Sequence, residues 1–156
     1  DVHMSRGLGD VYKRQLEDQA LNKKNKLIEL KKPKKIRKVI LCSGKIYFDL
    51  LAAREKEKID DVVFIRIEQL YPFPVRSLTK AIKPYVENAK FIWCQEEPKN
   101  MGAWFSVRDY IQWTLDNLEV KKKIEFIGRN PSASPATGYA KRHAKQQKEI
   151  IDKILE

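Results

Sequence analysis

The sequence lacks long apolar runs and is poor in cysteine and histidine. Its 156 residues include two Cys and two His, and each apolar run covers only a handful of residues. A transmembrane helix needs about 20 consecutive apolar residues, and the charged amino terminus lacks the apolar stretch of a secretory signal. Hydrophobic residues still make up 42% of the chain, enough for the core of one domain. We therefore expect a soluble protein inside the cell, with no membrane anchor.

The few cysteines and histidines do not form a known catalytic or metal-binding pattern. Cys42 and Cys94 each lie in an apolar run without Cys or His at metal-ligand spacing, which favours buried structural thiols in a reducing compartment. His3 and His143 are the only imidazoles, and no Gly-x-Ser-x-Gly segment exists to build a hydrolase. The segment 43–45 lacks both the spaced glycines of a dinucleotide fingerprint and the P-loop pattern.

Positive charge is concentrated toward the amino terminus. The net charge is +11, and residues 1–38 hold twelve Lys and Arg against five Asp and Glu. Residues 39–156 hold twenty against sixteen. The basic stretches 23–26 and 31–35 carry few aromatic side chains, which stacking on nucleic-acid bases would need. A solvated linker is the favoured interpretation, and a nucleic-acid-binding arm is the alternative.

The chain divides into three parts. Residues 1–15 show no sustained periodicity and are expected to be an extraneous or disordered leader. Residues 16–37 are the basic linker, and residues 38–156 form the folded domain.

Apolar strands and amphipathic helices alternate along this domain. The predicted strands are 39–43, 62–67, 90–94 and 123–127. The predicted helices begin at residues 46, 75, 104 and about 139, and Pro84 should kink or restart the second of them. Four strands that are each followed by a helix predict an α/β fold, with a mostly parallel sheet covered by helices on both faces.

Unusual segments follow three of the predicted strands. Residues 68–74 combine two prolines with two aromatic residues, and residues 128–138 are rich in small and hydroxyl side chains. Between them in sequence, Glu96 and Glu97 precede Pro98, which should hold both carboxylates on a stiffened turn. The segments that follow parallel strands share one edge of the sheet, where α/β proteins bind ligands or neighbouring domains. The alternative is that these segments pack only against one another.

Four ordered motifs resemble the carboxy-terminal domain of the thiamine-dependent first component of the 2-oxoglutarate dehydrogenase complex. The resemblance runs from about residue 16 to the end and includes Gln-Glu-Glu-Pro and Ser-Ala-Ser-Pro-Ala segments. The motifs are 39–51 with Ser-Gly-Lys, 66–74 with Tyr-Pro-Phe-Pro, 93–104 with Gly-Ala-Trp, and 132–139. Transketolases and pyruvate dehydrogenases share the fold of this domain.

The resemblance implies a fragment of a larger enzyme. In the complete subunit, thiamine diphosphate with magnesium supports decarboxylation of 2-oxoglutarate and transfer of the succinyl group to a lipoyl arm of the dihydrolipoyl succinyltransferase component. The groups that bind and activate this cofactor belong to preceding domains, so no catalytic residue and no bound cofactor is expected in this chain. Such a subunit forms a homodimer in the bacterial cytoplasm or the mitochondrial matrix, without nucleic-acid or membrane partners.

The expected role of the domain is to complete the dimer and buttress the active-site entrance. The residues expected to do so are Glu96, Glu97, Asn100, Trp104, Arg129, Ser132 and Ser134. An alternative is a freestanding domain that binds an anionic nucleotide or acyl-CoA near Arg129, Lys141 and Arg142. A nucleic-acid-binding module that uses the basic arm is a third possibility.

Overall fold

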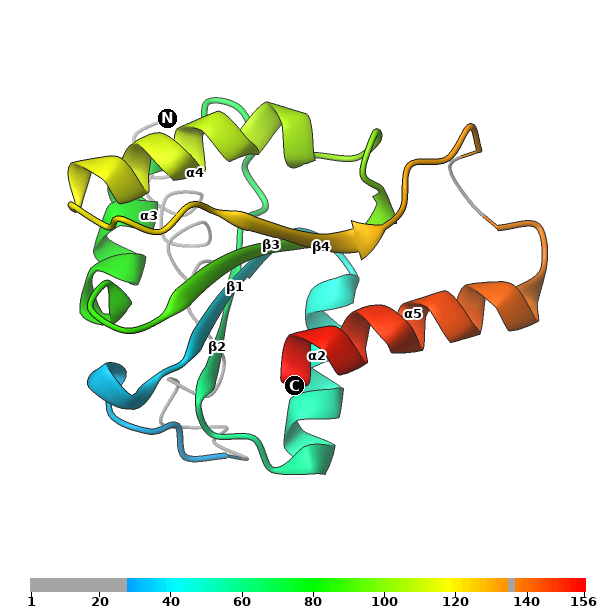
Figure 1. Ribbon diagram of the computed structural model, residues 1–156, viewed down its shortest axis with the longest axis horizontal. Coiled ribbons are helices and arrows are strands. Elements are labelled where there is room, and N and C mark those ends of the chain that lie inside the picture. The colour runs from blue at the N-terminus through cyan, green and yellow to red at the C-terminus, as the bar shows by residue number, and fades with distance from the viewer. Residues whose placement is uncertain (1–27, 135–136) are drawn as a thin grey trace, which may run out of the picture.

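The computed structural model describes residues 28–134 and 137–156, in which strands and helices alternate (Figure 1). The strands are β1 (Lys38–Cys42), β2 (Val62–Arg66), β3 (Lys90–Pro98) and β4 (Glu125–Arg129). The helices are α2 (Ile46–Glu57), α3 (Val75–Ile82), α4 (Trp104–Asn117) and α5 (Ala140–Leu155). Short 3-10 turns, η2 (Pro33–Lys35) and η3 (Lys83–Tyr85), precede β1 and follow α3.

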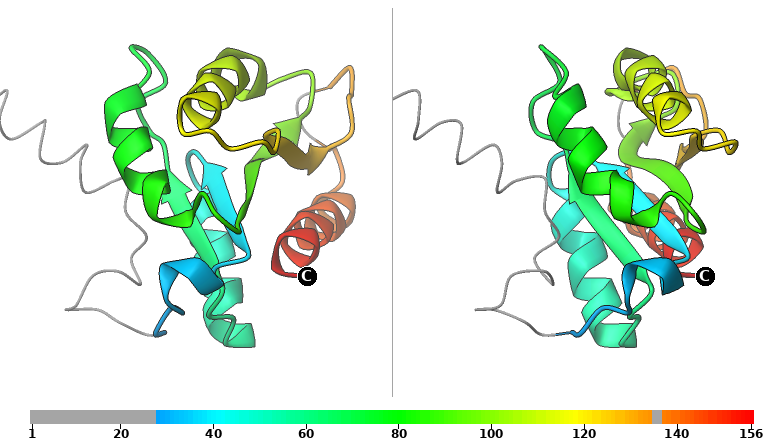
Figure 2. Two further views of the ribbon diagram at one scale, coloured as in Figure 1. Left: turned by 60° about the vertical axis from the view of Figure 1, so that its left-hand side comes forward. Right: turned by 90° about the vertical axis from the view of Figure 1, so that its left-hand side faces the viewer.

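The sheet is parallel throughout, with the strand order β2-β1-β3-β4. The chain passes from β1 to β2 on one side, then crosses back over β1 to β3 and continues to β4. Right-handed crossovers in opposite directions place their helices on opposite faces of the sheet. Accordingly, α3 and α4 lie together on one face, and α2 and α5 cover the other (Figures 1 and 2). The predicted α/β fold is confirmed.

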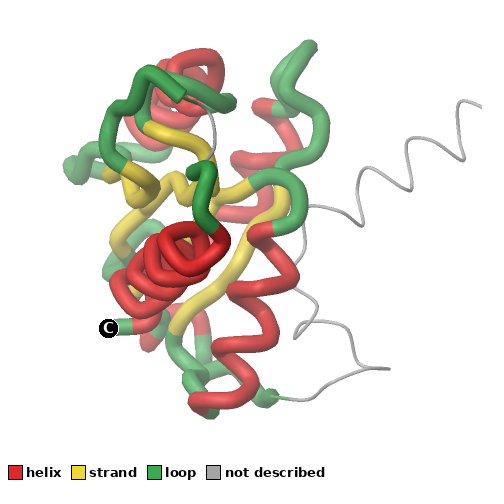
Figure 3. Tube along the Cα trace, turned by 90° about the vertical axis from the view of Figure 1, so that its right-hand side faces the viewer, coloured by secondary structure: helices red, strands yellow, loops and turns green. Residues whose placement is uncertain are grey.

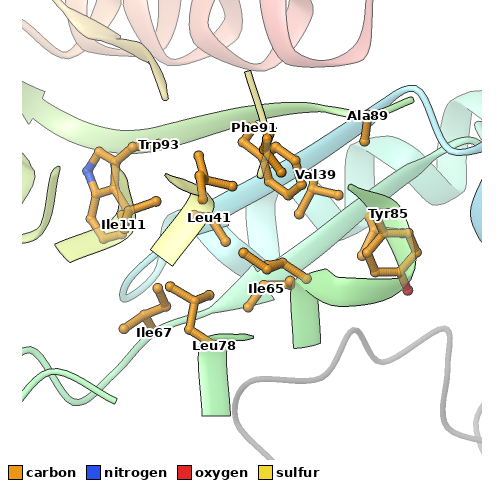
Figure 4. Close-up of a cluster of buried hydrophobic side chains, with 14 of the residues drawn as sticks. Val39, Leu41, Ile65, Ile67, Leu78, Tyr85, Ala89, Phe91, Trp93 and Ile111 are labelled. Atoms are coloured by element: carbon orange, nitrogen blue, oxygen red, sulfur yellow. The ribbon is translucent and has the colours of Figure 1, made fainter. Parts of the chain in front are cut away.

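The largest apolar cluster lies between the sheet and the α3/α4 layer. Side chains from the strands meet side chains from the two helices and η3 (Figure 4). The labelled members are Val39, Leu41, Ile65, Ile67, Leu78, Tyr85, Ala89, Phe91, Trp93 and Ile111. A second cluster joins the opposite face to α2 and α5. Both faces of β1, β2 and the first part of β3 are therefore covered, which explains their continuous apolar runs, whereas the edge strand β4 is only partly buried.

One charged side chain, that of Arg54, is buried between the sheet and the helices α2 and α5, although charged residues are rarely buried completely. Arg54 of α2 is 0% exposed; its Nη1 donates to the carbonyl of Val62 at 3.1 Å, and its guanidinium lies 4.7 Å from the ring centre of Phe64. A backbone acceptor and an aromatic face offset part of the desolvation cost of this charge. No spacing rule applied to the sequence pointed to a buried arginine there.

The last helix is held at its carboxyl end by two cations from the start of β1. Lys38 Nζ donates to the carbonyls of Lys153 and Ile154 at 3.2 and 3.1 Å, and Arg37 donates to the carbonyl of Leu155. These bonds satisfy carbonyls that have no partner within the helix, and positive charge at that end complements the helix dipole. Burial is the main reason why the pKa of Lys38 is lowered.

The segment before β1 packs on the domain. Ile36 is 1% exposed within the α3/α4 cluster, Leu30 packs against the same cluster, and Lys31 forms ion pairs with Asp60 and Asp61 at 2.8 and 3.5 Å. Residues 30–37, which the sequence assigned to the basic linker, therefore belong to the packed structure. The basic stretch 23–26 and the predicted leader lie outside the described residues.

Two strands differ from their predicted bounds by more than one residue. β3 continues to Pro98 instead of ending at residue 94, so Glu96 and Glu97 lie in a strand and not on a turn beyond it. The β3–β4 register shifts between Cys94 and Pro98, and pairing resumes at Pro98, which lies opposite Arg129. β4 lies two residues later than predicted, at 125–129 instead of 123–127. As predicted, the second helix is interrupted near Pro84: α3 ends at Ile82, and Pro84 lies in the 3-10 turn η3 that follows.

Both cysteines are buried strand thiols, as predicted. Cys42 and Cys94 are 0% exposed and lie opposite each other in the β1–β3 register. Burial is the main cause of a raised pKa for the Cys94 thiol, so its reactive thiolate form is disfavoured. Within residues 28–134 and 137–156, no helix is long and apolar enough to cross a membrane.

Candidate functional site at the carboxyl edge

The loops that follow the strands gather at one edge of the parallel sheet, here called the carboxyl edge. Figure 3 shows the molecule from the side toward which β4 points and where the loop to α5 lies. The chain turns in opposite directions after β1 and β3, which are neighbours in the sheet. Ligands of open α/β sheets bind in the crevice at such a point, so the residues at the ends of β1 and β3 are candidates for a functional site.

A cluster of polar side chains lies at the ends of β1 and β3. Lys45, after β1, lies 3.1 Å from Asp49 Oδ2 and 4.0 Å from Glu96 Oε1. Gln147 of α5 donates to the same two carboxylates, at 3.0 Å to Asp49 Oδ2 and 2.9 Å to Glu96 Oε1. The hydrogen bond with Asp49 is the main reason why the pKa of Lys45 is raised. Glu96 therefore serves here to bind α5 and α2 to the end of β3.

The two adjacent glutamates do not act together. Successive residues of a strand point to opposite faces, and Glu96 turns toward α2 and α5 with a side chain that is 26% exposed. Glu97 is exposed at the edge. A paired-carboxylate site is therefore not formed, and Glu97 is the member of the pair that is available to contact something outside the domain.

Gln95 organises the turn between β3 and α4, a role that the sequence did not reveal. Its side chain is buried, and Oε1 accepts from Trp93 Nε1 at 2.9 Å and from the Trp104 amide at 3.0 Å. Its Nε2 donates to the carbonyls of Met101 at 2.6 Å and Pro98 at 3.1 Å. Donors on one side and acceptors on the other fix the orientation of this amide. The sequence did contain one signal for this role: Gln95 is a polar residue at a strand position whose side chain should face the core.

Gly102 allows the same turn to pass close to Gln95. It has a φ of +67°, and a Cβ there would lie 2.9 Å from Gln95 Nε2. Both the left-handed backbone and the lack of space require glycine at this position. The start of α4 follows directly, and the Trp104 ring is 7% exposed and packs against Phe126 at 5.2 Å. Trp104 is thus a core residue beneath the turn.

The loops after β3 and β4 are joined by paired hydrogen bonds. Asn100 Nδ2 donates to the carbonyl of Ser132 at 2.9 Å, and the Ser132 amide donates to Asn100 Oδ1 at 3.0 Å. The Ser134 amide donates to Ser132 Oγ at 3.2 Å, and Arg129 Nε donates to the carbonyl of Glu96. The structure therefore brings together the predicted residues of these two loops.

A hollow of about 360 Å³ lies between the β4–α5 loop and α5. Arg129, Arg142 and Lys153 line it with positive charge, and Glu149 adds one negative charge. Two of the three cations considered for an anionic ligand, Arg129 and Arg142, thus face the same hollow, whereas Lys141 is not among its lining residues.

The third unusual segment lies apart from the other two. The turn 68–74 follows β2, which is separated from β3 and β4 by β1. Glu68 Oε1 accepts from the Gly44 amide at 3.2 Å, and Phe73 stacks on Tyr110 of α4 at 5.2 Å. All three segments share the carboxyl edge as predicted, but only two of them form one connected surface.

The chain matches the family described as 2-oxoglutarate dehydrogenase C-terminal over residues 8–155. This match begins within the predicted leader, further toward the amino terminus than the motif resemblance did. The chain is 45% identical over 145 residues to the protein named 2-oxoglutarate dehydrogenase E1 component of Brucella abortus (strain S19). The aligned part covers 92% of this chain and 14% of that protein. The corresponding proteins of Brucella anthropi and Brucella canis are 44% identical with the same coverage.

The chain therefore spans 14% of the length of these curated relatives. The matches do not support a freestanding nucleotide-binding domain or a nucleic-acid-binding module. A family match over nearly the whole chain and the high identity agree with the parallel α/β fold and the motifs at its carboxyl edge. The chain belongs to the 2-oxoglutarate dehydrogenase C-terminal family.

Proposed function

We propose that this chain works as the carboxy-terminal domain of a first-component (E1) subunit of the 2-oxoglutarate dehydrogenase complex. That subunit would decarboxylate 2-oxoglutarate and pass the succinyl group to the lipoyl groups of the dihydrolipoyl succinyltransferase component. The domain would share its fold with the carboxy-terminal domain of transketolases. Since the matched relatives are bacterial, we assign it to the bacterial cytoplasm.

The domain's own role in this proposal is to complete the homodimer and support the active-site entrance. The observation that carries this role is the reciprocal pair between Asn100 and Ser132, which joins the loops after β3 and β4 into one surface. Asn100, Ser132 and Glu97 are exposed on that surface. A surface that is held in shape by its own hydrogen bonds, yet leaves polar groups accessible, suits docking of a neighbouring domain.

Thiamine diphosphate and magnesium are assigned to the preceding domains, because the residues here do not fit them. Within residues 28–134 and 137–156, no group of three or more His, Cys, Asp or Glu side chains could hold a metal ion. Asp49 and Glu96 of the polar cluster are already bound by Lys45 and Gln147. Calorimetric titration of the 156-residue chain with the cofactor and magnesium should show no saturable heat; micromolar binding would overturn this assignment.

Charge-neutral substitutions in the full-length subunit test the supporting role. If Glu97 meets a cation across a buried interface, Glu97→Gln should weaken dimer association by about 3–5 kcal/mol, whereas loss of a solvated carboxylate costs about 0–1 kcal/mol. Glu57→Gln is the matched control, since Glu57 is an exposed glutamate at the end of α2, far from the carboxyl edge. Dimer dissociation and turnover would be measured for both variants.

We expect only Glu97→Gln to lower assembly or turnover, with the melting temperature of the 156-residue chain unchanged by either substitution. Equal behaviour of the two variants in the full-length subunit would show that Glu97 is solvated there, and the supporting role would fail.

A further inference from the structure

Most of the large exposed hydrophobic side chains lie on one side of the molecule. Tyr71 is 88% exposed in the turn before α3, and Phe105, Tyr110 and Trp113 of α4 are 51%, 46% and 57% exposed. Phe73 of the same turn stacks on Tyr110 at 5.2 Å, so the turn and the helix form one continuous surface. We call these five residues the aromatic face. Clusters of exposed aromatic residues of this kind mark protein interfaces more often than solvated surface.

The charge distribution sets this face apart from the rest of the surface. α4 carries one basic residue, Arg108, in a chain that holds 32 Lys and Arg in 156 residues. Arg108 lies over the ring of Phe105 at 5.1 Å. The exposed side of α5, by contrast, is rich in lysine and arginine, as a solvated helix in this chain would be. The exposed side of α4 thus combines Phe105, Tyr110 and Trp113 with a few charged residues of both signs, Arg108, Asp109 and Asp116, whereas that of α5 is mostly basic.

The described part of the chain enters at the amino edge of the sheet, where the Lys31 amide donates to the carbonyl of Asp60 at 2.8 Å. Leu30 and Ile36, which precede β1, both pack into the apolar cluster beneath α3 and α4. The chain spans 14% of the matched relatives and corresponds to their carboxy-terminal family domain, so the rest of such a protein would be joined at this amino end. That preceding part would be several times longer than this chain, which covers 14% of the relative, so it is large enough to cover an exposed face of the domain.

We infer that the aromatic face is the docking surface for the part of the parent subunit that precedes this domain. The inference rests on the proposed function, because it needs that parent subunit. The partner surface would be apolar at its centre, with pockets for Tyr71 and Trp113, since buried aromatic anchors provide most of the binding energy of such interfaces.

Hydroxyl-radical footprinting read by mass spectrometry tests the inference directly. Oxidation of Tyr71, Phe105 and Trp113 would be compared between the 156-residue chain and the full-length subunit. Phe48 of α2, which is 50% exposed on the opposite side of the sheet, is the matched control. We expect oxidation of the aromatic face to fall at least about fivefold in the full-length subunit, as for side chains removed from solvent at an interface core, while the oxidation of Phe48 falls less.

Two results would overturn the inference. Equal oxidation of the aromatic face in both proteins would show that it stays solvated. Protection that appears in the 156-residue chain alone and grows with its concentration would show that a second copy of this chain covers the face.

The test of the aromatic face and the test of the proposed function can fail independently of each other. If the aromatic face stays exposed while Glu97→Gln impairs the full-length subunit, only the docking inference fails. If Trp113→Ser leaves the full-length subunit as resistant to proteolysis between its domains as Phe48→Ser does, the docking inference fails as well.

Discussion

Replacing Gln95 with leucine should destabilise the domain more than most single substitutions. The side chain accepts hydrogen bonds from Trp93 Nε1 and from the Trp104 amide, and both donors are buried. Leucine has a similar volume but no acceptor, so both donors would lose their partner while the apolar packing is roughly conserved. The carbonyls of Met101 and Pro98 would lose a donor as well.

The expected loss follows from the two stranded donors. A buried donor without a partner costs about 1–3 kcal/mol, so the two together cost about 2–6 kcal/mol. A central loss of about 4 kcal/mol is a large share of the roughly 5–15 kcal/mol that stabilises a typical domain. For a chain of this size, it corresponds to a fall of roughly 8–16 °C in melting temperature.

Urea denaturation followed by tryptophan fluorescence would measure this loss, with Gln95→Glu as the companion variant. A carboxylate can still accept from both donors, but its second oxygen would face the Met101 and Pro98 carbonyls, which raises its folded pKa above the unfolded value. The deficit of Gln95→Glu should therefore be largest at pH 7 and shrink as the pH falls toward about 4. The deficit of Gln95→Leu should not follow this dependence. If Gln95→Leu unfolds within about 0.5 kcal/mol of the parent chain, the network does not hold the turn and this reasoning is refuted.

Three further predictions concern single positions. Gly102→Ala should cost more than Gly44→Ala in urea denaturation, because both have a positive φ but only the first places a Cβ within 4 Å of other atoms; equal costs would remove the argument from close approach. For Asp61, burial raises the pKa, but the hydrogen bond and charge of Arg37 outweigh it and the pKa is lowered. Asp61→Asn should thus cost about 0–1 kcal/mol at pH 7, and this cost should vanish as the pH falls below the unfolded value of about 3.9 and through the folded pKa. Cys94 should resist alkylation at pH 8 until denaturant is added, because burial raises its pKa; rapid labelling of the folded chain would contradict its burial.

The sequence by itself determined which segments form strands and helices. Each apolar run closed by a charged or glycine-containing turn became a strand, and the apolar spacing of residues 104–115 became the buried side of α4. The missing amide of Pro84 predicted an interruption, and α3 gives way to the 3-10 turn η3 that contains this proline. These features depend on neighbours within a few residues, so local rules capture them. The motifs that indicated the family are local for the same reason.

Only the tertiary structure decided which of these segments meet. The strand order placed β1 between β2 and β3, and this order separates the turn 68–74 from the joined loops after β3 and β4. The pairing with β4 carried β3 through Glu96 and Glu97, so the two carboxylates turned to opposite faces instead of sharing a turn. Gln95 acquired its role because Trp104 and Met101 return to it from the next helix and turn. Such contacts form only after the strands have paired and the turn has taken its path. The spacing of apolar residues along the chain does not show which polar groups will then meet, so it does not predict these contacts.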